Sequence, residues 1–137
     1  MSKLHEIASA IKSDLESHFQ TVRVSAVQTP EQFTRELKAM NPNKLPGVII
    51  VFDNLNINSM EGIQEFSFTL VVVDKFTAAS DAKAISVFRA GADLLDLFPS
   101  DGRTLSGMHV YPTDCVAASP DAEFASLALG IICKQGF

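Results

Sequence analysis

Hydrophobic positions in the first third of the chain switch between helix spacing and strand spacing. In residues 2–19 the apolar positions recur at gaps of three and four, which predicts an amphipathic helix. Residues 21–27 alternate apolar and polar side chains, which predicts a strand. A second helix is expected over residues 29–40, because Thr29 can cap it and Pro30 suits its first turn.

The middle of the chain predicts a pair of apolar strands. Residues 47–52, GVIIVF, form a continuous apolar run, which is typical of a strand covered on both faces. Residues 63–74 form a longer strand that is apolar on both faces near its end. The polar segment 53–62, DNLNINSMEG, joins them. We therefore expect an antiparallel hairpin with this segment as a long tip.

The C-terminal half predicts one long helix followed by three strands. The helix is expected over residues 80–98, with Phe88 and Leu95 at the centre of its apolar stripe and so in the core. Pro99 ends it, and a turn-rich loop follows over residues 99–107. The remaining periodicity predicts strands over residues 107–112, 114–119 and 124–134.

Composition fits a single folded domain. The chain has 137 residues, about the length of one domain, and 47% hydrophobic against 20% charged residues excludes intrinsic disorder. The predicted order is αβαββαβββ. It indicates a single α+β domain over residues 1–137, in which amphipathic helices pack on a mostly antiparallel sheet.

Charge and hydropathy exclude some classes of binding partner. The net charge is −5, and the basic residues are scattered rather than gathered into a footprint, which argues against sequence-specific nucleic-acid binding. No apolar run approaches the roughly 18 residues of a membrane span, so no membrane partner is expected. Charged residues interrupt the N-terminal segment, which excludes a secretory signal and favours synthesis in the cytoplasm.

Motifs for catalysis and cofactor binding are absent from the sequence. No Walker A sequence and no G-x-G-x-x-G after a strand is present. Ser106, His109 and Asp114 are close in sequence, but no G-x-S-x-G elbow surrounds the serine. We interpret them as a loop serine beside a strand histidine. No catalytic or cofactor-binding residue is predicted, and the protein is not expected to be an enzyme.

Two patterns suggest a metal site, and both are incomplete. Asp14 and His18 are spaced to share a helix face, but no second group of ligands completes a site. A calcium-loop spacing is formed by Asn54, Asn56, Asn58 and Glu65. Its first ligand should be aspartate, its sixth position should be glycine, and its flanks should be helices. No metal is therefore predicted.

The chain has two cysteines, Cys115 and Cys133, which is too few for a disulfide framework. Both fall in predicted strands without an activating neighbour. We expect buried, reduced thiols that are dispensable for function.

More apolar surface is present than one small core requires. The strand over residues 63–74 is apolar on both faces at its end, and the tip of the hairpin carries Leu55, Ile57 and Met60. One interpretation is that layers cover both faces of the sheet and the tip folds back. The other is a subunit interface, in which Leu55, Ile57 and Met60 form one of the patches.

Six segments carry a resemblance that covers nearly the whole chain. They are the amphipathic helix LHEIASAIKSDL, the Leu-Pro loop and strand KLPGVIIVFD, the long strand EFSFTLVVVD, the alanine-rich helix DAKAISVFRAGADLLDLF, and the strands HVYPTD and FASLALGIIC. In this order and at this length, the chain resembles the small phage tail terminator (tail completion) proteins. The resemblance is one of layout rather than of a diagnostic motif.

The resemblance implies a structural role in the virion tail. It implies a homohexameric ring on the head-proximal end of the tail tube, which stops tube polymerisation and offers a surface to the head-tail connector. The implied partners are further copies of the chain, the tail tube protein and the connector protein. Two alternatives remain open. One is a small-molecule-binding or enzymatic α+β domain with its site under the loops 53–62 and 99–107, and the other is a different head-tail joint protein.

Overall fold

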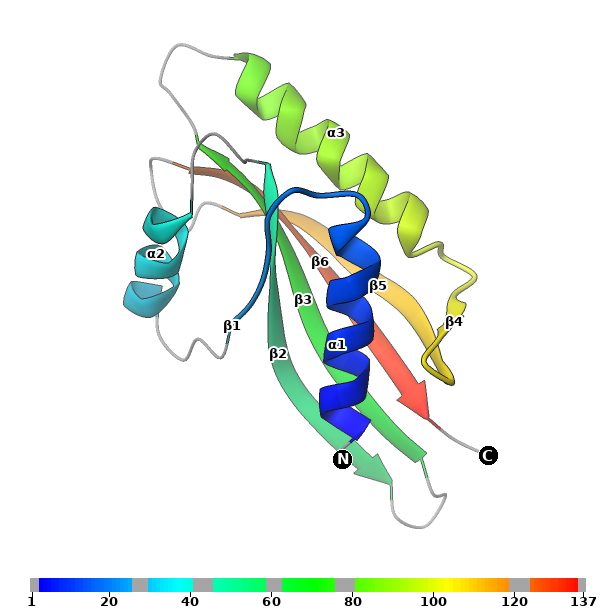
Figure 1. Ribbon diagram of the computed structural model, residues 1–137. Coiled ribbons are helices and arrows are strands. Elements are labelled where there is room, and N and C mark those ends of the chain that lie inside the picture. The colour runs from blue at the N-terminus through cyan, green and yellow to red at the C-terminus, as the bar shows by residue number, and fades with distance from the viewer. Residues whose placement is uncertain are drawn as a thin grey trace.

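A six-stranded sheet in the order β1-β2-β3-β6-β5-β4 forms the centre of the protein (Figure 1). The computed structural model describes residues 3–25, 30–40, 46–58, 63–75, 81–118 and 124–135. The helices are α1 (Lys3–Glu16), α2 (Pro30–Ala39) and α3 (Asp81–Leu97). The strands are β1 (Val22–Ser25), β2 (Gly47–Asn58), β3 (Ile63–Lys75), β4 (Arg103–Leu105), β5 (Met108–Ala118) and β6 (Phe124–Gln135). The α+β class is confirmed, and so is the predicted order of helices and strands as far as α3.

The sheet is mixed, which corrects the expectation of a mostly antiparallel sheet. β1 runs parallel to β2, with Val22 opposite Val48, while each of the other four neighbouring pairs is antiparallel. The cause is the connection, because α2 lies between β1 and β2 in the chain, and a helical crossover returns the chain to the same end of the sheet.

The predicted hairpin is confirmed, but its arms are longer than expected. β2 and β3 pair antiparallel from Gly47 opposite Val73 to Asn58 opposite Ile63. Most of the segment expected as a polar tip is therefore strand, interrupted by a bulge between Phe52 and Asn54. Residues 59–62 lie outside the described residues.

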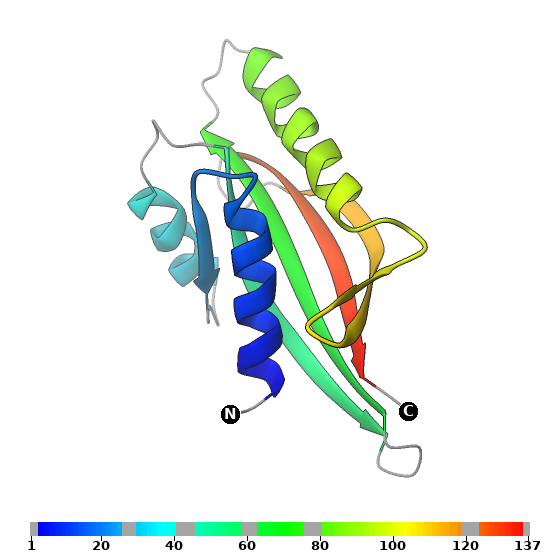
Figure 2. The same ribbon diagram turned by 45° about the vertical axis from the view of Figure 1, so that its right-hand side comes forward.

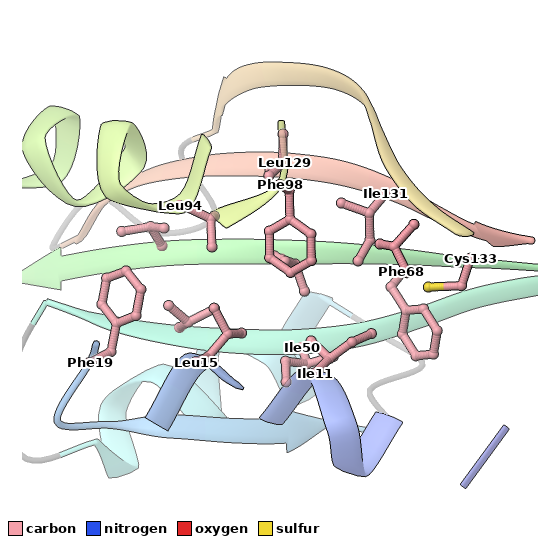
Figure 3. Close-up of a cluster of buried hydrophobic side chains, with 14 of the residues drawn as sticks. Ile11, Leu15, Phe19, Ile50, Phe68, Leu94, Phe98, Leu129, Ile131 and Cys133 are labelled. Atoms are coloured by element: carbon pink, nitrogen blue, oxygen red, sulfur yellow. The ribbon is translucent and has the colours of Figure 1, made fainter. Parts of the chain in front are cut away.

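The main core lies between the sheet and two helices, α1 and α3, which share one side of it; we call this side the front face (Figure 2). Figure 3 shows Leu15 of α1 and Leu94 of α3 meeting side chains of the strands. The largest fully buried members of this core are Phe66, Phe68, Phe98, Ile7, Ile11, Leu15, Ile50, Leu70, Leu94 and Met108. Burial of this apolar area is the main force holding the helices on the sheet.

A smaller core lies on the opposite side of the sheet, the back face. Leu37 and Met40, in and just after α2, pack there against Ile49, Val71 and Val73. The central strands are thus covered on both faces, as their continuous apolar runs predicted. In the part of the chain that the structure describes, no helix is long and apolar enough to cross a membrane.

The prediction of which side of α3 faces the core was wrong. Phe88 is 59% exposed and Leu95 is 43% exposed, whereas Val87 and Leu94 are buried. The helix approaches the sheet on the side of its small residues, where a β-carbon on Gly91 would meet Leu127 of β6. Close packing at this point leaves Phe88 and Leu95 outside the contact with the sheet, while Leu94 and Phe98 remain in the core.

The strands after α3 also differ from the prediction. The two short strands expected over residues 107–112 and 114–119 are one strand, β5, with a bulge between Pro112 and Asp114. The loop expected over residues 99–107 contains β4. Ser106 and Gly107, at φ of 52° and 76°, make the tight turn from β4 to β5.

Candidate functional site: two apolar patches at opposite edges of the sheet

Exposed large hydrophobic side chains of the described residues gather toward the two edges of the sheet. Toward the edge formed by β1 and β2 lie Val24, Phe52 and Leu55, which we call the β2 patch. Toward the edge formed by β5 lie Phe88, Leu95 and Val116, which we call the β5 patch. The strands between them, β3 and β6, expose no large hydrophobic side chain among the described residues. This separation is the main feature of the surface.

The β2 patch faces the front of the sheet. Residues opposite each other on neighbouring strands point to the same face. Phe52 lies opposite Phe68, with the two rings edge to face at 5.5 Å, and Leu55 lies opposite Phe66. Because Phe66 and Phe68 belong to the main core, Phe52 and Leu55 extend that core outward to the edge of the sheet.

A bulge in β2 keeps these two residues on one face. The register shifts between Phe52 and Asn54, which leaves Asp53 as the extra residue. Without that shift, alternation would bring Asn54 rather than Leu55 to the front. The hydroxyl of Thr69 donates a hydrogen bond to Asp53 at 2.6 Å and so fixes the bulged residue to β3.

Among the described residues, the outer edge of β2 is unpaired over much of its length. β1 pairs with β2 only from Val22 opposite Val48 to Ser25 opposite Val51. From Phe52 to Asn58, no strand in the described part of the chain pairs with the outer side of β2. Main-chain groups along this stretch can therefore accept another strand.

The β5 patch begins on one flank of α3. Phe88 and Leu95 lie three residues before and four residues after Gly91, so all three share one side of the helix. Gly91 lies against Leu127 of β6, while α3 packs on β3 and β6. Because Gly91 meets β6, we infer that the flank with Phe88 and Leu95 is turned toward β6 and the strand next to it, β5.

Beneath this flank, the front face of β5 carries small side chains. Cys115 lies opposite Leu129 and Ala117 lies opposite Leu127; these two residues of β5 face the front and are exposed. Val116 lies between them and is 51% exposed on the back face. At these two positions the front face of β5 thus carries small, exposed side chains.

The outer edge of β5 is open as well. β4 pairs with β5 only from Arg103 opposite Val110 to Leu105 opposite Met108. Beyond Val110, no described strand lies on the outer side of β5. An open strand edge therefore accompanies each apolar patch, and the two lie on opposite sides of the sheet.

The structure describes the three predicted interface residues to different extents. Leu55 is exposed at 38% and belongs to the β2 patch. Ile57 lies in β2 with its backbone opposite Gln64, and Met60 lies outside the described residues. Sequence reasoning missed the other five exposed side chains, although Phe52 ends an apolar run and the stripe of α3 is wider than one packing face.

The possible catalytic residues lie along β5 and the turn before it, and the structure does not bring them together. Ser106 lies in the β4–β5 turn, and His109 and Asp114 both lie on β5. Five residues of extended strand span about 16 Å, which is too far for contact between the two side chains. The ring of His109 packs instead near Tyr111, at 5.6 Å between centroids, and Asp114 accepts a hydrogen bond from Thr113 at 3.1 Å.

The possible metal ligands have other structural roles. Asp14 forms an ion pair with Arg103 at 2.9 Å, and His18 lies beyond the end of α1. The asparagines of the calcium-like pattern lie along β2 rather than in a loop, and Glu65 faces Lys134 at 3.8 Å. Among the residues that the structure describes, no group of three His, Cys, Asp or Glu side chains could hold a metal ion.

The two cysteines are free and differ in environment. Cys133 is buried in the main core, and burial raises the pKa of its thiol to about 12. Cys115 is exposed, which corrects the expectation that both thiols are buried. The reason is that α3 packs on β3 and β6 and leaves this part of β5 uncovered.

No known family model matches the sequence, and no curated protein matches it. A functional proposal must therefore rest on the surface and on the layout of the chain. Both patches are features of the protein's edges rather than of a concave pocket, and edges of this kind are typical of protein–protein contacts.

Proposed function

We propose that the protein is a structural virion component that forms a homo-oligomeric ring, six-fold in symmetry, on the head-proximal end of a phage tail tube. In this role it ends polymerisation of the tube and joins the tail to the head connector. The proposal requires no catalytic residue and no cofactor.

One observation carries the proposal: two unlike apolar patches lie at opposite edges of one sheet. A two-fold dimer buries the same patch on both copies and would leave the other patch in water. A closed ring joins unlike patches head to tail, so every copy buries both. The apolar area that a single copy exposes is therefore buried on every copy only in a closed ring or, apart from its ends, in an open filament.

The tail role is supported by the layout of the chain, which resembles that of tail terminator proteins from the first helix to the last strand. The net charge of −5 is compatible with that role, because an acidic ring would repel DNA that passes through it. A ring at the end of a tube also needs different partners on its two faces, the tube protein and the connector.

Mass measurement and electron microscopy test this proposal. We expect the purified protein to form rings, either alone or after addition of a tail tube protein, and the rings to sit at one end of the tubes. Tubes assembled with excess protein should be shorter than tubes assembled without it. A protein that stays monomeric both alone and with the tube protein would refute the proposal.

A further inference from the structure

We propose that the subunit interface of this ring is a β-sheet continued from one copy to the next. In this arrangement the outer edge of β2, residues 52–58, pairs antiparallel with the outer edge of β5, residues 114–118, in the neighbouring copy. Phe52 and Leu55 then pack beneath Phe88 and Leu95 of that neighbour. The inference rests on the proposed ring and specifies how its copies are joined.

Strand direction favours this pairing. β2 is antiparallel to β3, β3 to β6 and β6 to β5, so three reversals make β5 antiparallel to β2 within one copy. The two open stretches lie at opposite ends of the sheet, because the strand pairing places Phe52 level with Pro112 and Val48 level with Ala117. Strands of a closed barrel are tilted by about 35–45° to its axis, which shifts each copy along the strands of its neighbour. A ring with such a tilt would bring the two open edges together as an antiparallel pair, with its regular hydrogen bonds perpendicular to the strands.

The two patches lie on matching faces except for Val116, which is on the back face. Phe52 and Leu55 are on the front face, and so are Cys115, Ala117 and the flank of α3. Strands of one sheet lie about 4.8 Å apart, and a helix with its side chains is about 10 Å wide. A strand added outside β5 would therefore lie next to the exposed flank of α3.

The shapes of the two edges are complementary. Large side chains, Phe52 and Leu55, stand on the β2 edge, and small ones, Cys115 and Ala117, form the front of the β5 edge. The small residues leave room under α3, and the large residues of the added strand fill it. This fit explains why the occupant is a second copy of the chain, since the chain itself supplies the strand that the β5 edge lacks.

Two carboxylates limit the register of the pair. Asp53 and Asp114 are both exposed, one at each bulge. Like charges placed directly opposite each other on neighbouring strands are destabilising. The favoured registers are those that keep the two side chains apart, and the test must therefore sample more than one position on β2.

Cysteine cross-linking on the assembled ring tests the interface, with the native Cys115 as the reporter. Paired residues of antiparallel strands have Cα atoms about 4.5–5.5 Å apart, which suits a disulfide. We would prepare Phe52→Cys and Leu55→Cys, oxidise each with copper phenanthroline, and separate the products on a denaturing, non-reducing gel. We expect at least one of them to give a ladder of covalent oligomers, because each copy is joined to two neighbours.

Two controls test which cysteine is the cross-linking partner and which face of β2 is involved. The ladder should disappear when Cys115→Ser is combined with the productive variant. Asn56→Cys is the matched control, since Asn56 is exposed on the same strand but lies opposite Glu65 on the back face. It should give no ladder with Cys115. Thermal melting of each reduced variant verifies that it folds as the wild type does.

The outcomes separate the two proposals. Rings that form while neither variant cross-links would overturn the continued sheet and leave the ring standing. A product that stops at the dimer and survives Cys115→Ser would show symmetric pairing of β2 with itself, which contradicts both the interface and its head-to-tail nature. Wild-type protein that never assembles would refute the ring and, with it, the interface.

Discussion

Arg103 of β4 and Asp14 of α1 form an ion pair at 2.9 Å, although 89 positions separate them in the sequence. The guanidinium of Arg103 also donates a hydrogen bond to the carbonyl oxygen of Leu97 at 3.0 Å and lies 6.0 Å from the centre of the Phe98 ring. One side chain thus links the first helix, the end of α3 and an edge strand.

A double-mutant cycle should reveal this link. Asp14→Ala is expected to lower the free energy of unfolding by about 1 kcal/mol, and Arg103→Ala by about 2 kcal/mol, because the second change also leaves the Leu97 carbonyl without its donor. The coupling between the two sites should be about 1 kcal/mol, which urea denaturation can measure. Strictly additive losses would show that the ion pair contributes nothing.

Two residues of α3 should respond very differently to truncation. Leu94 is 2% exposed in the main core, so Leu94→Ala should cost about 2–5 kcal/mol. Phe88 is 59% exposed, so Phe88→Ala should change the stability of a dilute monomer by less than about 1 kcal/mol. Chemical denaturation at low protein concentration measures both. A large loss for Phe88→Ala under those conditions would mean that α3 is rotated relative to the arrangement described above.

The buried thiol should make stability depend on pH in the alkaline range. Burial raises the pKa of Cys133 from 9.0 to about 12, so the folded state holds this proton more tightly than the unfolded state does. The associated stability is fully present below pH 9 and is lost as the pH rises from there toward 12. Cys133→Ala should be less stable at neutral pH and should lose less stability over that alkaline range.

Thiol labelling provides the control for this third prediction. At neutral pH the folded protein should react at the exposed Cys115 only, and the unfolded protein at both cysteines. Equal labelling rates in the folded protein would contradict the burial of Cys133. The same reagent on Cys115→Ser should leave the folded protein unlabelled.

The order and type of the elements could be read from hydrophobic periodicity, because each element has one face that must be buried. The rotation of α3 about its own axis, which decides the side that faces the sheet, could not be read in this way. Its apolar residues cover more than one packing face, so periodicity alone does not decide between Phe88 and Leu94. The pair Ala90 and Gly91 carried the missing signal, since two adjacent small residues mark where a helix can approach a sheet closely.

The mixed sheet could have been anticipated, since a strand, a helix and a strand in succession, as in β1, α2 and β2, commonly form a parallel pair. Bulges are harder to predict. Pro112 was expected to end a strand, and instead it lies at a bulge within β5. Part of the candidate site was visible from the sequence as the apolar positions of segment 53–62, of which Leu55 is exposed. The β5 patch was not, because it depends on which side of α3 faces the strands.

β2 and β5, whose outer edges are partly unpaired within the described residues, each carry a bulge, at Phe52/Asn54 in β2 and at Pro112/Asp114 in β5. A bulge bends its strand and increases the local twist. In a sheet that passes from copy to copy, such a bend would recur at every junction, and equal bends in the same sense add up around an axis. The consequence would be curvature: the two irregular residues would give the proposed assembly a way to return to its starting point instead of growing as an endless ribbon.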